Sequence, residues 1–208
     1  MVIPQKVREW VRRHHRLYHL IGRIEYAISP PKEDNWDQIY APKREVIKNY
    51  TQKFGARIFI ETGTYKGDTV FSLQNYFDKL YSIELDKDLF GEAKKRFAND
   101  EKIKILHGDS SKILPILLTE INEKIVFWLD AHYSHRNTAL GKKFTPIEEE
   151  LEAIANHRIK DHIILMDDAK DFNGKFDYPD IEKVRIFSAQ KFANHTFEVK
   201  DNIIRIVP

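Results

Sequence analysis

The chain has 208 residues, of which 42% are hydrophobic and 12% aromatic, a composition that suits one globular domain with a core of ordinary size. Its net charge is only +2 and it has no cysteine, which excludes disulfides, cysteine nucleophiles, thiolate metal sites and a global positive field that recruits nucleic acid. No apolar run reaches the ~20 residues that span a bilayer, and charges interrupt the N-terminus, so we expect a cytoplasmic protein without a signal peptide.

The N-terminal segment predicts a basic amphipathic helix. Residues 4–24 carry apolar side chains at helical spacing, with arginines and histidines between them. Such a helix packs on its own domain or on a second copy of the chain, or it binds a membrane surface, an acidic partner or RNA. We favour packing, because an apolar stripe is the usual mark of a helix on a core. Residues 1–44 are therefore expected to form a helical extension.

Strands and helices are expected to alternate along the rest of the chain. Trp36 and Tyr40 are expected in a polar loop, where they either pack down on the domain or line a substrate entrance. Pro42 is expected to open a helix that ends near residue 53. Short apolar runs then predict strands and periodic segments predict helices. The expected strands are 58–60, 80–84, 103–107, 125–130 and 162–166, the expected helices are 70–77, 88–99, 110–119, 145–157 and 179–191, and a final hairpin pairs 196–199 with 203–207. This alternation predicts an α/β protein with a Rossmann-like doubly wound sheet, mostly parallel, with an antiparallel C-terminal hairpin.

The most informative stretch is Glu61–Thr69, which carries glycines at positions 63 and 67. It follows a buried strand and precedes a helix, so it forms a strand-to-helix turn. Gly63 lets the backbone turn tightly, and Gly67 lets the helix pack close to the strand. Free N–H groups at the helix start suit a carboxylate or a phosphate, although an ordinary turn gives the same pattern.

A carboxylate at the end of the next strand favours a nucleoside ligand. Glu84 follows the first glycine by about twenty residues, where nucleotide-binding folds place an acid on ribose hydroxyls. The nicotinamide fingerprint is absent because position 65 is Tyr. An adenosine ligand without a diphosphate therefore fits better.

These motifs, with Gly108-Asp109-Ser110 after the third strand, resemble those of class I S-adenosylmethionine-dependent methyltransferases over residues 45–208. The resemblance implies that Gly63 and Thr64 approach the methionine part of the cofactor and that Glu84 holds the ribose. It also implies that Leu85 lies against the adenine. The expected cofactor-binding residues are Glu61, Gly63, Thr64, Tyr65, Gly67, Thr69, Glu84, Leu85, Asp109, Ser110 and Asp130.

Three further carboxylates follow two neighbouring strands: Asp130, Asp167 and Asp168. Neighbouring strands lie ~4.8 Å apart, so these acids are expected to converge beyond the strand ends. A hard divalent cation such as Mg²⁺ or Ca²⁺ would relieve their mutual repulsion. Alternatively, they cap helices or pair with Lys170 and Arg136.

The same stretch, Glu61–Thr69, also resembles Mg²⁺-dependent catechol and macrolide-sugar O-methyltransferases. That resemblance implies that Asp130, Asp167 and Asp168 hold Mg²⁺, which lowers the pKa of an acceptor hydroxyl. The lysine base of the catechol enzyme falls on Tyr133 here. We therefore expect His132 to be the base. The other catalytic candidates are Tyr133, His135 and Lys170.

The expected function is Mg²⁺-dependent O-methylation of a small molecule or sugar, with a vicinal diol at least as well supported as a catechol. A nucleic-acid methyltransferase is the first alternative, but the chain lacks the motif of adenine enzymes and the cysteine of C5 enzymes. A non-catalytic adenosyl-binding or assembly module is the second, and the intact acids argue against it. Residues 132–144 are expected to form a mobile cover over the site, before a helix that begins with a Thr145–Glu148 capping box.

Overall fold

A computed structural model describes residues 36–132, 139, 141 and 143–208 of the chain. The basic helix expected over residues 4–24 lies outside the described residues. So do Tyr133 and most of the expected cover. Within the described ranges, no helix combines the length and the apolar character that a bilayer crossing needs.

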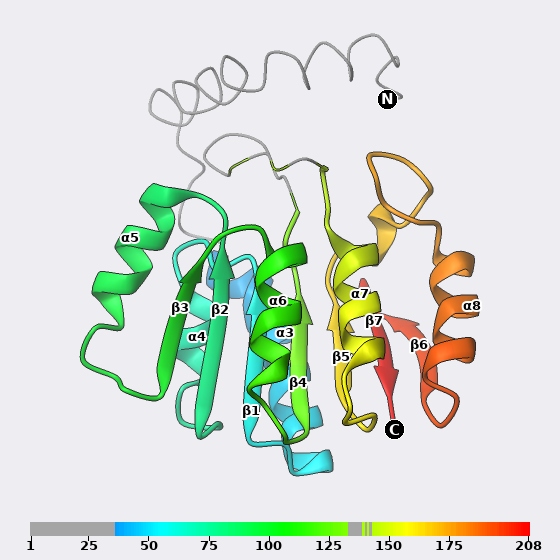
Figure 1. Ribbon diagram of the computed structural model, residues 1–208, viewed down its shortest axis with the longest axis horizontal. Helices are drawn as coiled ribbons and strands as arrows, with labels where there is room; N and C mark the ends of the chain where they lie inside the picture. The colour runs from blue at the N-terminus through cyan, green and yellow to red at the C-terminus, as the bar shows by residue number, and fades with distance from the viewer. Residues whose placement is uncertain (1–35, 133–138, 140, 142) are drawn as a thin grey trace, which may run out of the picture.

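A seven-stranded sheet forms the centre of the molecule, in the order β3-β2-β1-β4-β5-β7-β6 (Figure 1). The first five strands are parallel, whereas β7 is antiparallel to both β5 and β6. This confirms the doubly wound sheet and its C-terminal hairpin. The bounds are β1 Ile58–Thr62, β2 Lys79–Glu84, β3 Ile103–His107, β4 Ile125–Leu129, β5 Ile163–Met166, β6 Thr196–Lys200 and β7 Ile203–Val207.

Helices cover both faces of the sheet. Helices α3, α4 and α5 lie on one face, and α6, α7 and α8 lie on the other (Figure 1). Because side chains alternate along a strand, Ile58 and Ile60 pack toward α6 and α7, whereas Phe59 packs toward α3 and α4. The bounds are α3 Trp36–Phe54, α4 Asp68–Leu73, α5 Lys87–Arg96, α6 Ser110–Thr119, α7 Ile147–Asn156 and α8 Ile181–Lys191, with a short 3-10 turn, η2, at Ala169–Asp171.

The topology indicates where a ligand would bind. The sequence order of the strands reverses between β1 and β4, which are direct neighbours in the sheet. In open α/β sheets, ligands bind beyond the carboxyl ends of the strands at this reversal. The turn after β1 and the residues after β4 therefore define the candidate site.

Three local expectations are wrong. Helix α3 begins at Trp36 and contains Pro42, so Trp36 and Tyr40 are helical rather than in a loop. Proline is tolerated at the cost of one backbone hydrogen bond, and α3 is anchored on the core by the fully buried Ile47. Helix α4 is shorter than expected and ends at Leu73. At the start of α7 the hydroxyl of Thr145 accepts the N–H of Ile147 at 3.4 Å, but within the described residues no Glu148 hydrogen bond completes the expected capping box.

Candidate active site at the strand ends

The glycine turn packs directly on the end of β4. Gly63 has a φ of 92°, and a Cβ at this position would lie 2.6 Å from the carbonyl oxygen of Asp130. No other residue permits this approach. Gly67 is equally restricted, because its φ is 79° and a Cβ would lie 2.7 Å from the ring of Phe97. Gly63 thus makes the tight turn expected of it, whereas Gly67 makes room for the ring of Phe97, which follows α5, and not for the strand as the sequence had suggested.

Glu84 joins the glycine turn to the start of α5. Its Oε2 accepts the backbone N–H of Tyr65 at 2.8 Å, and its Oε1 accepts that of Asp86 at 2.8 Å. Burial raises the pKa of Glu84, and these backbone hydrogen bonds oppose the shift. An ionised carboxylate has about four acceptor positions, so Glu84 retains acceptor capacity for a ligand hydroxyl.

A buried polar network supports the turn from below. The Ser82 hydroxyl donates to Oε2 of Glu61 at 2.6 Å, and the hydroxyls of Thr64 and Ser82 lie 2.6 Å apart. Burial, reinforced by the charge of Asp130, raises the pKa of Glu61 to about 8, so this acid is protonated at neutral pH. Glu61 therefore holds the turn in place as a neutral hydrogen-bonding group. The sequence signal for Ser82 was a small polar residue in an otherwise apolar strand.

The expected adenine side lies between the ends of β2 and β3. The N–H of Gly108 donates to the carbonyl of Glu84 at 2.9 Å, which fixes the start of α6 beside β2. Asp109 caps α6 and accepts the N–H of Ser111 at 3.0 Å. A Cβ on Gly141 would lie 3.3 Å from Cδ2 of Leu85, so the described part of the long loop passes over this side chain.

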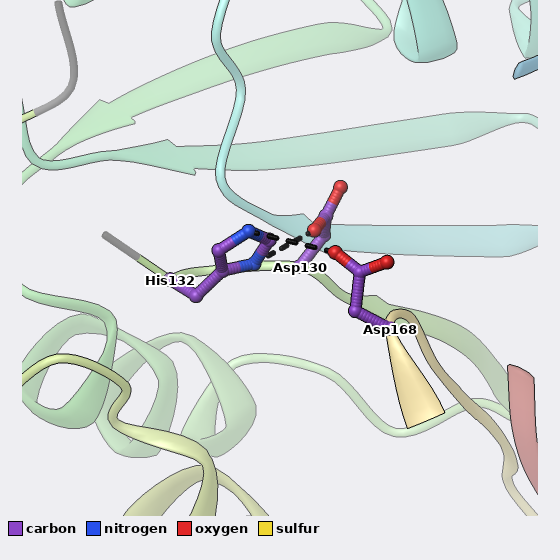
Figure 2. A group of neighbouring side chains, drawn as sticks. All are labelled: Asp130, His132 and Asp168. Carbon is purple, nitrogen blue, oxygen red and sulfur yellow. Dashed lines mark ion pairs between the residues drawn. The ribbon is translucent and has the colours of Figure 1, made fainter. Parts of the chain in front are cut away.

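Beyond β4 and β5, a histidine faces two carboxylates (Figure 2). Nδ1 of His132 lies 3.1 Å from Oδ1 of Asp130, and Nε2 lies 3.6 Å from Oδ2 of Asp168. One donor atom from each residue lies within 4.8 Å of the other two. Burial opposes a charge on His132, but its hydrogen bond to Asp130 and the surrounding acids outweigh it and raise its pKa to about 9.

Asp167 has a different partner from the one the sequence suggested. Its Oδ2 lies 2.5 Å from Nζ of Lys43 on α3, and its Oδ1 accepts the N–H of Asp168 at 2.7 Å. Burial and the charge of Asp130 raise the pKa of Asp167 to about 7, and Lys43 opposes this shift. Among the described residues, the side chains whose ligand atoms converge are Asp130, His132 and Asp168, while Asp167 pairs with Lys43. Metal binding by the three aspartates stays a prediction.

Two phenols flank these acids. Burial raises the pKa of Tyr40, and the charges of the aspartates add to the shift. The same causes raise the pKa of Tyr178, whose ring centroid lies 6.5 Å from that of His132. Lys170, which the sequence suggested as a catalytic residue, lies at the rim of the site: its side chain is exposed and its Nζ lies 3.7 Å from Oδ1 of Asp168. Sequence reasoning missed Tyr178 because no local motif marks it.

The donor set fits a divalent cation. Asp130 and Asp168 offer carboxylate oxygens, which suit Mg²⁺ and Mn²⁺, and the imidazole of His132 is a ligand that transition metals accept. Three aspartates lie close together at this site. Lys43 pairs with Asp167, the exposed Lys170 lies near Asp168, and His132 faces Asp130 and Asp168. A cation that bound in place of the His132 proton would keep the charges of Asp130 and Asp168 neutralised.

Comparison of this architecture with solved structures identifies the fold. The O-methyltransferase TomG from Streptomyces achromogenes, solved with S-adenosylmethionine, matches with a TM-score of 0.57 and 15% identity, over 93% of this chain and 98% of that one. A Podospora anserina methyltransferase with bound S-adenosylhomocysteine matches with a TM-score of 0.55 and 13% identity, over 100% and 98%. The fold is that of the class I methyltransferases.

The methyltransferase fold alone does not specify the acceptor, because both O- and N-methyltransferases have it. The N-methyltransferase NodS from Bradyrhizobium japonicum also matches, with a TM-score of 0.54 and 12% identity over 83% of this chain and 98% of that one. No protein-family model matches the chain, and no curated protein matches it in sequence. Within the methyltransferase fold, the expected cofactor residues follow β1, β2, β3 and β4 along one edge of the sheet, and the acids lie beside them.

Proposed function

We propose that this chain is an S-adenosylmethionine-dependent methyltransferase that acts on a hydroxyl of a small molecule or sugar, assisted by a divalent cation. The observation that carries this proposal is the contact between Gly63 and the backbone of Asp130. It joins the turn expected to bind the methyl donor to the first residue of the acid cluster. A methyl donor on one side and an acceptor on the other would meet at this contact.

The proposed cofactor contacts follow from the methyltransferase fold. Glu84 would accept hydrogen bonds from the ribose hydroxyls, and the N–H groups at the start of α4 would face the methionine carboxylate. Leu85 would lie against the adenine, with Asp109 and Ser110 near its edge. The neutral Glu61 would hold the turn in position beneath the cofactor.

Asp130, His132 and Asp168 would hold the cation, which supplies Lewis acidity that lowers the pKa of an acceptor hydroxyl. Both nitrogens of His132 face carboxylates, so His132 would have to release a proton before it could serve as a third ligand, as metal binding to histidine requires. Its role as the general base that the sequence led us to expect stays a prediction. The protein's main contribution is position, since methyl transfer needs the oxygen, the carbon and the sulfur in line and nearly in contact. Tyr40 and Tyr178 would form walls beside the acceptor.

Calorimetry with S-adenosylmethionine tests the cofactor site. Glu84→Gln removes the charge that the ribose hydroxyls would meet, and charged hydrogen bonds are worth roughly 1.5–3 kcal/mol, so affinity should fall about tenfold or more. Glu92→Gln in α5 is the control, because Glu92 is exposed and its replacement should leave the affinity unchanged. Equal affinities for both variants and the wild type would overturn the cofactor assignment.

A panel of acceptors tests the reaction. Sugar nucleotides, glycosides, catechols and RNA would each be incubated with labelled cofactor and Mg²⁺ or Mn²⁺, with and without a chelator. Transfer to glycosides that the chelator abolishes is the expected result. Transfer that survives the chelator would overturn the metal role, and transfer to RNA alone would overturn the acceptor class. The cytoplasmic location and pairing of copies through the N-terminal helix stay predictions.

A further inference from the structure

The turn between β6 and β7, near the C-terminal end of the chain, contacts the residues that follow β5, among them Asp168. Asn202 accepts the N–H of Ala169 on its backbone carbonyl at 2.9 Å. Its side-chain Oδ1 accepts the N–H of Lys170 at 3.0 Å, and its Nδ2 donates to Oδ1 of Asp168 at 2.9 Å. One residue thus makes three hydrogen bonds to three consecutive residues at the end of β5.

The direction of the Asn202 amide is fixed by its partners. A backbone N–H only donates, so the group that faces Lys170 must be the amide oxygen. The amide nitrogen then faces the carboxylate of Asp168, which accepts. The hydrogen bond to a charged acceptor is the stronger type, which makes Asn202 a well-defined donor to Asp168.

Asp168 needs such support because its backbone is unfavourable. Its φ is 52°, in the left-handed region that residues with a Cβ disfavour. Two hydrogen bonds hold it there: its N–H donates to Oδ1 of Asp167, and its Oδ1 accepts from Asn202. With Oδ1 engaged, Oδ2 is the oxygen that faces His132 at 3.6 Å.

We propose that Asn202 is a positioning residue of the cation site, which holds one oxygen of Asp168 so that the other is presented to the metal. The inference rests on the proposed function, since it requires a cation between Asp130, His132 and Asp168. Hydrogen-bond partners of this kind orient a metal ligand, and their loss typically lowers metal affinity about 10–100-fold. If Asn202 only held the β6–β7 hairpin against the end of β5, its replacement would lower the stability of the fold and leave metal affinity unchanged.

Titration of the full chain with Mn²⁺, followed by electron paramagnetic resonance of the free ion, separates these roles. Asn202→Gly removes the side chain at a φ of 60°, where glycine is the least strained residue, so the turn should still form. Asp201→Gly is the matched control. Asp201 has a φ of 53° in the same turn, but its carboxylate pairs with Arg205 instead of Asp168.

We expect Asn202→Gly to bind Mn²⁺ about 10–100-fold more weakly than the wild type, and Asp201→Gly to stay within about threefold of it. Affinity for S-adenosylhomocysteine, measured without a divalent cation, should be unchanged in both. In an Asp168→Ala background, Asn202→Gly should have no further effect on Mn²⁺ affinity, because Asn202 acts through Asp168.

Two outcomes would overturn the inference, and they are distinguishable. If the wild type binds Mn²⁺ and Asn202→Gly binds it equally well, the positioning role is wrong while the cation site stands. If the wild type binds no Mn²⁺, the cation site of the proposed function fails and the inference fails with it. Thermal unfolding of each variant shows whether a loss of affinity follows from a loss of structure.

Discussion

Replacement of Gly63 by alanine tests the contact on which the candidate site is built. A left-handed backbone costs an L-residue roughly 1–2 kcal/mol. The new Cβ would also lie 2.6 Å from the carbonyl oxygen of Asp130, and overpacking of this kind costs typically about 1–3 kcal/mol. Together these terms predict that Gly63→Ala lowers the free energy of unfolding by about 2–5 kcal/mol.

Gly55 provides a matched control on the other end of the same strand. Its φ is +64°, but a Cβ there would have nothing within 4 Å. Gly55→Ala should therefore cost only the backbone term of roughly 1–2 kcal/mol. The excess loss in Gly63→Ala measures the close approach of the turn to β4.

Urea unfolding followed by circular dichroism gives both free energies, and calorimetry with S-adenosylhomocysteine gives the functional effect. Gly63→Ala should lose cofactor affinity because the turn is displaced from β4, whereas Gly55→Ala should retain it. Equal losses of stability in the two variants would refute the close approach. Unchanged cofactor affinity in Gly63→Ala would refute the role of the turn.

Two buried titratable groups predict opposite dependences of stability on pH. His162 accepts the N–H of Ile125 on Nδ1 at 3.1 Å, and burial lowers its pKa to about 3. The contribution of neutral His162 to the free energy of unfolding is therefore fully present above pH ~6.5, the pKa of histidine in the unfolded chain. At lower pH this contribution decreases, and at pH 5 it is about 2 kcal/mol smaller. His162→Asn should remove this loss in urea titrations at pH 7 and pH 5, and an unchanged loss would contradict the assignment. Burial raises the pKa of Glu150 from 4.5 to about 7, so the folded state binds the proton more tightly and stability falls as pH rises between these values. The stability of Glu150→Gln relative to wild type should then increase by about 2–3 kcal/mol from pH 5 to pH 8, and a constant difference would argue against a buried neutral acid.

The central strands were predictable because they are buried on both faces. Each is a short apolar run that ends in a polar or acidic residue, as in Ile125–Leu129 followed by Asp130. A run of this kind has few alternatives to a parallel strand between helix layers. The glycine turn was predictable for a similar reason, since Gly63 and Gly67 both adopt positive φ.

Contacts between distant segments were not predictable from local pattern. Lys43 and Asp167 are 124 residues apart, and Asn202 and Asp168 are 34 apart. Nothing in the sequence states which of two consecutive aspartates faces the cluster. That choice depends on the left-handed backbone of Asp168, which tertiary hydrogen bonds stabilise.

The contact between Gly63 and Asp130 also has a thermodynamic consequence. The turn that would bind the methyl donor and the aspartate that would bind the cation cannot move independently, because their backbones are in contact. A ligand that fixes one side therefore reduces the freedom of the other before its own ligand arrives. Cofactor and cation should then bind cooperatively, and by reciprocity each should raise the affinity for the other by the same factor.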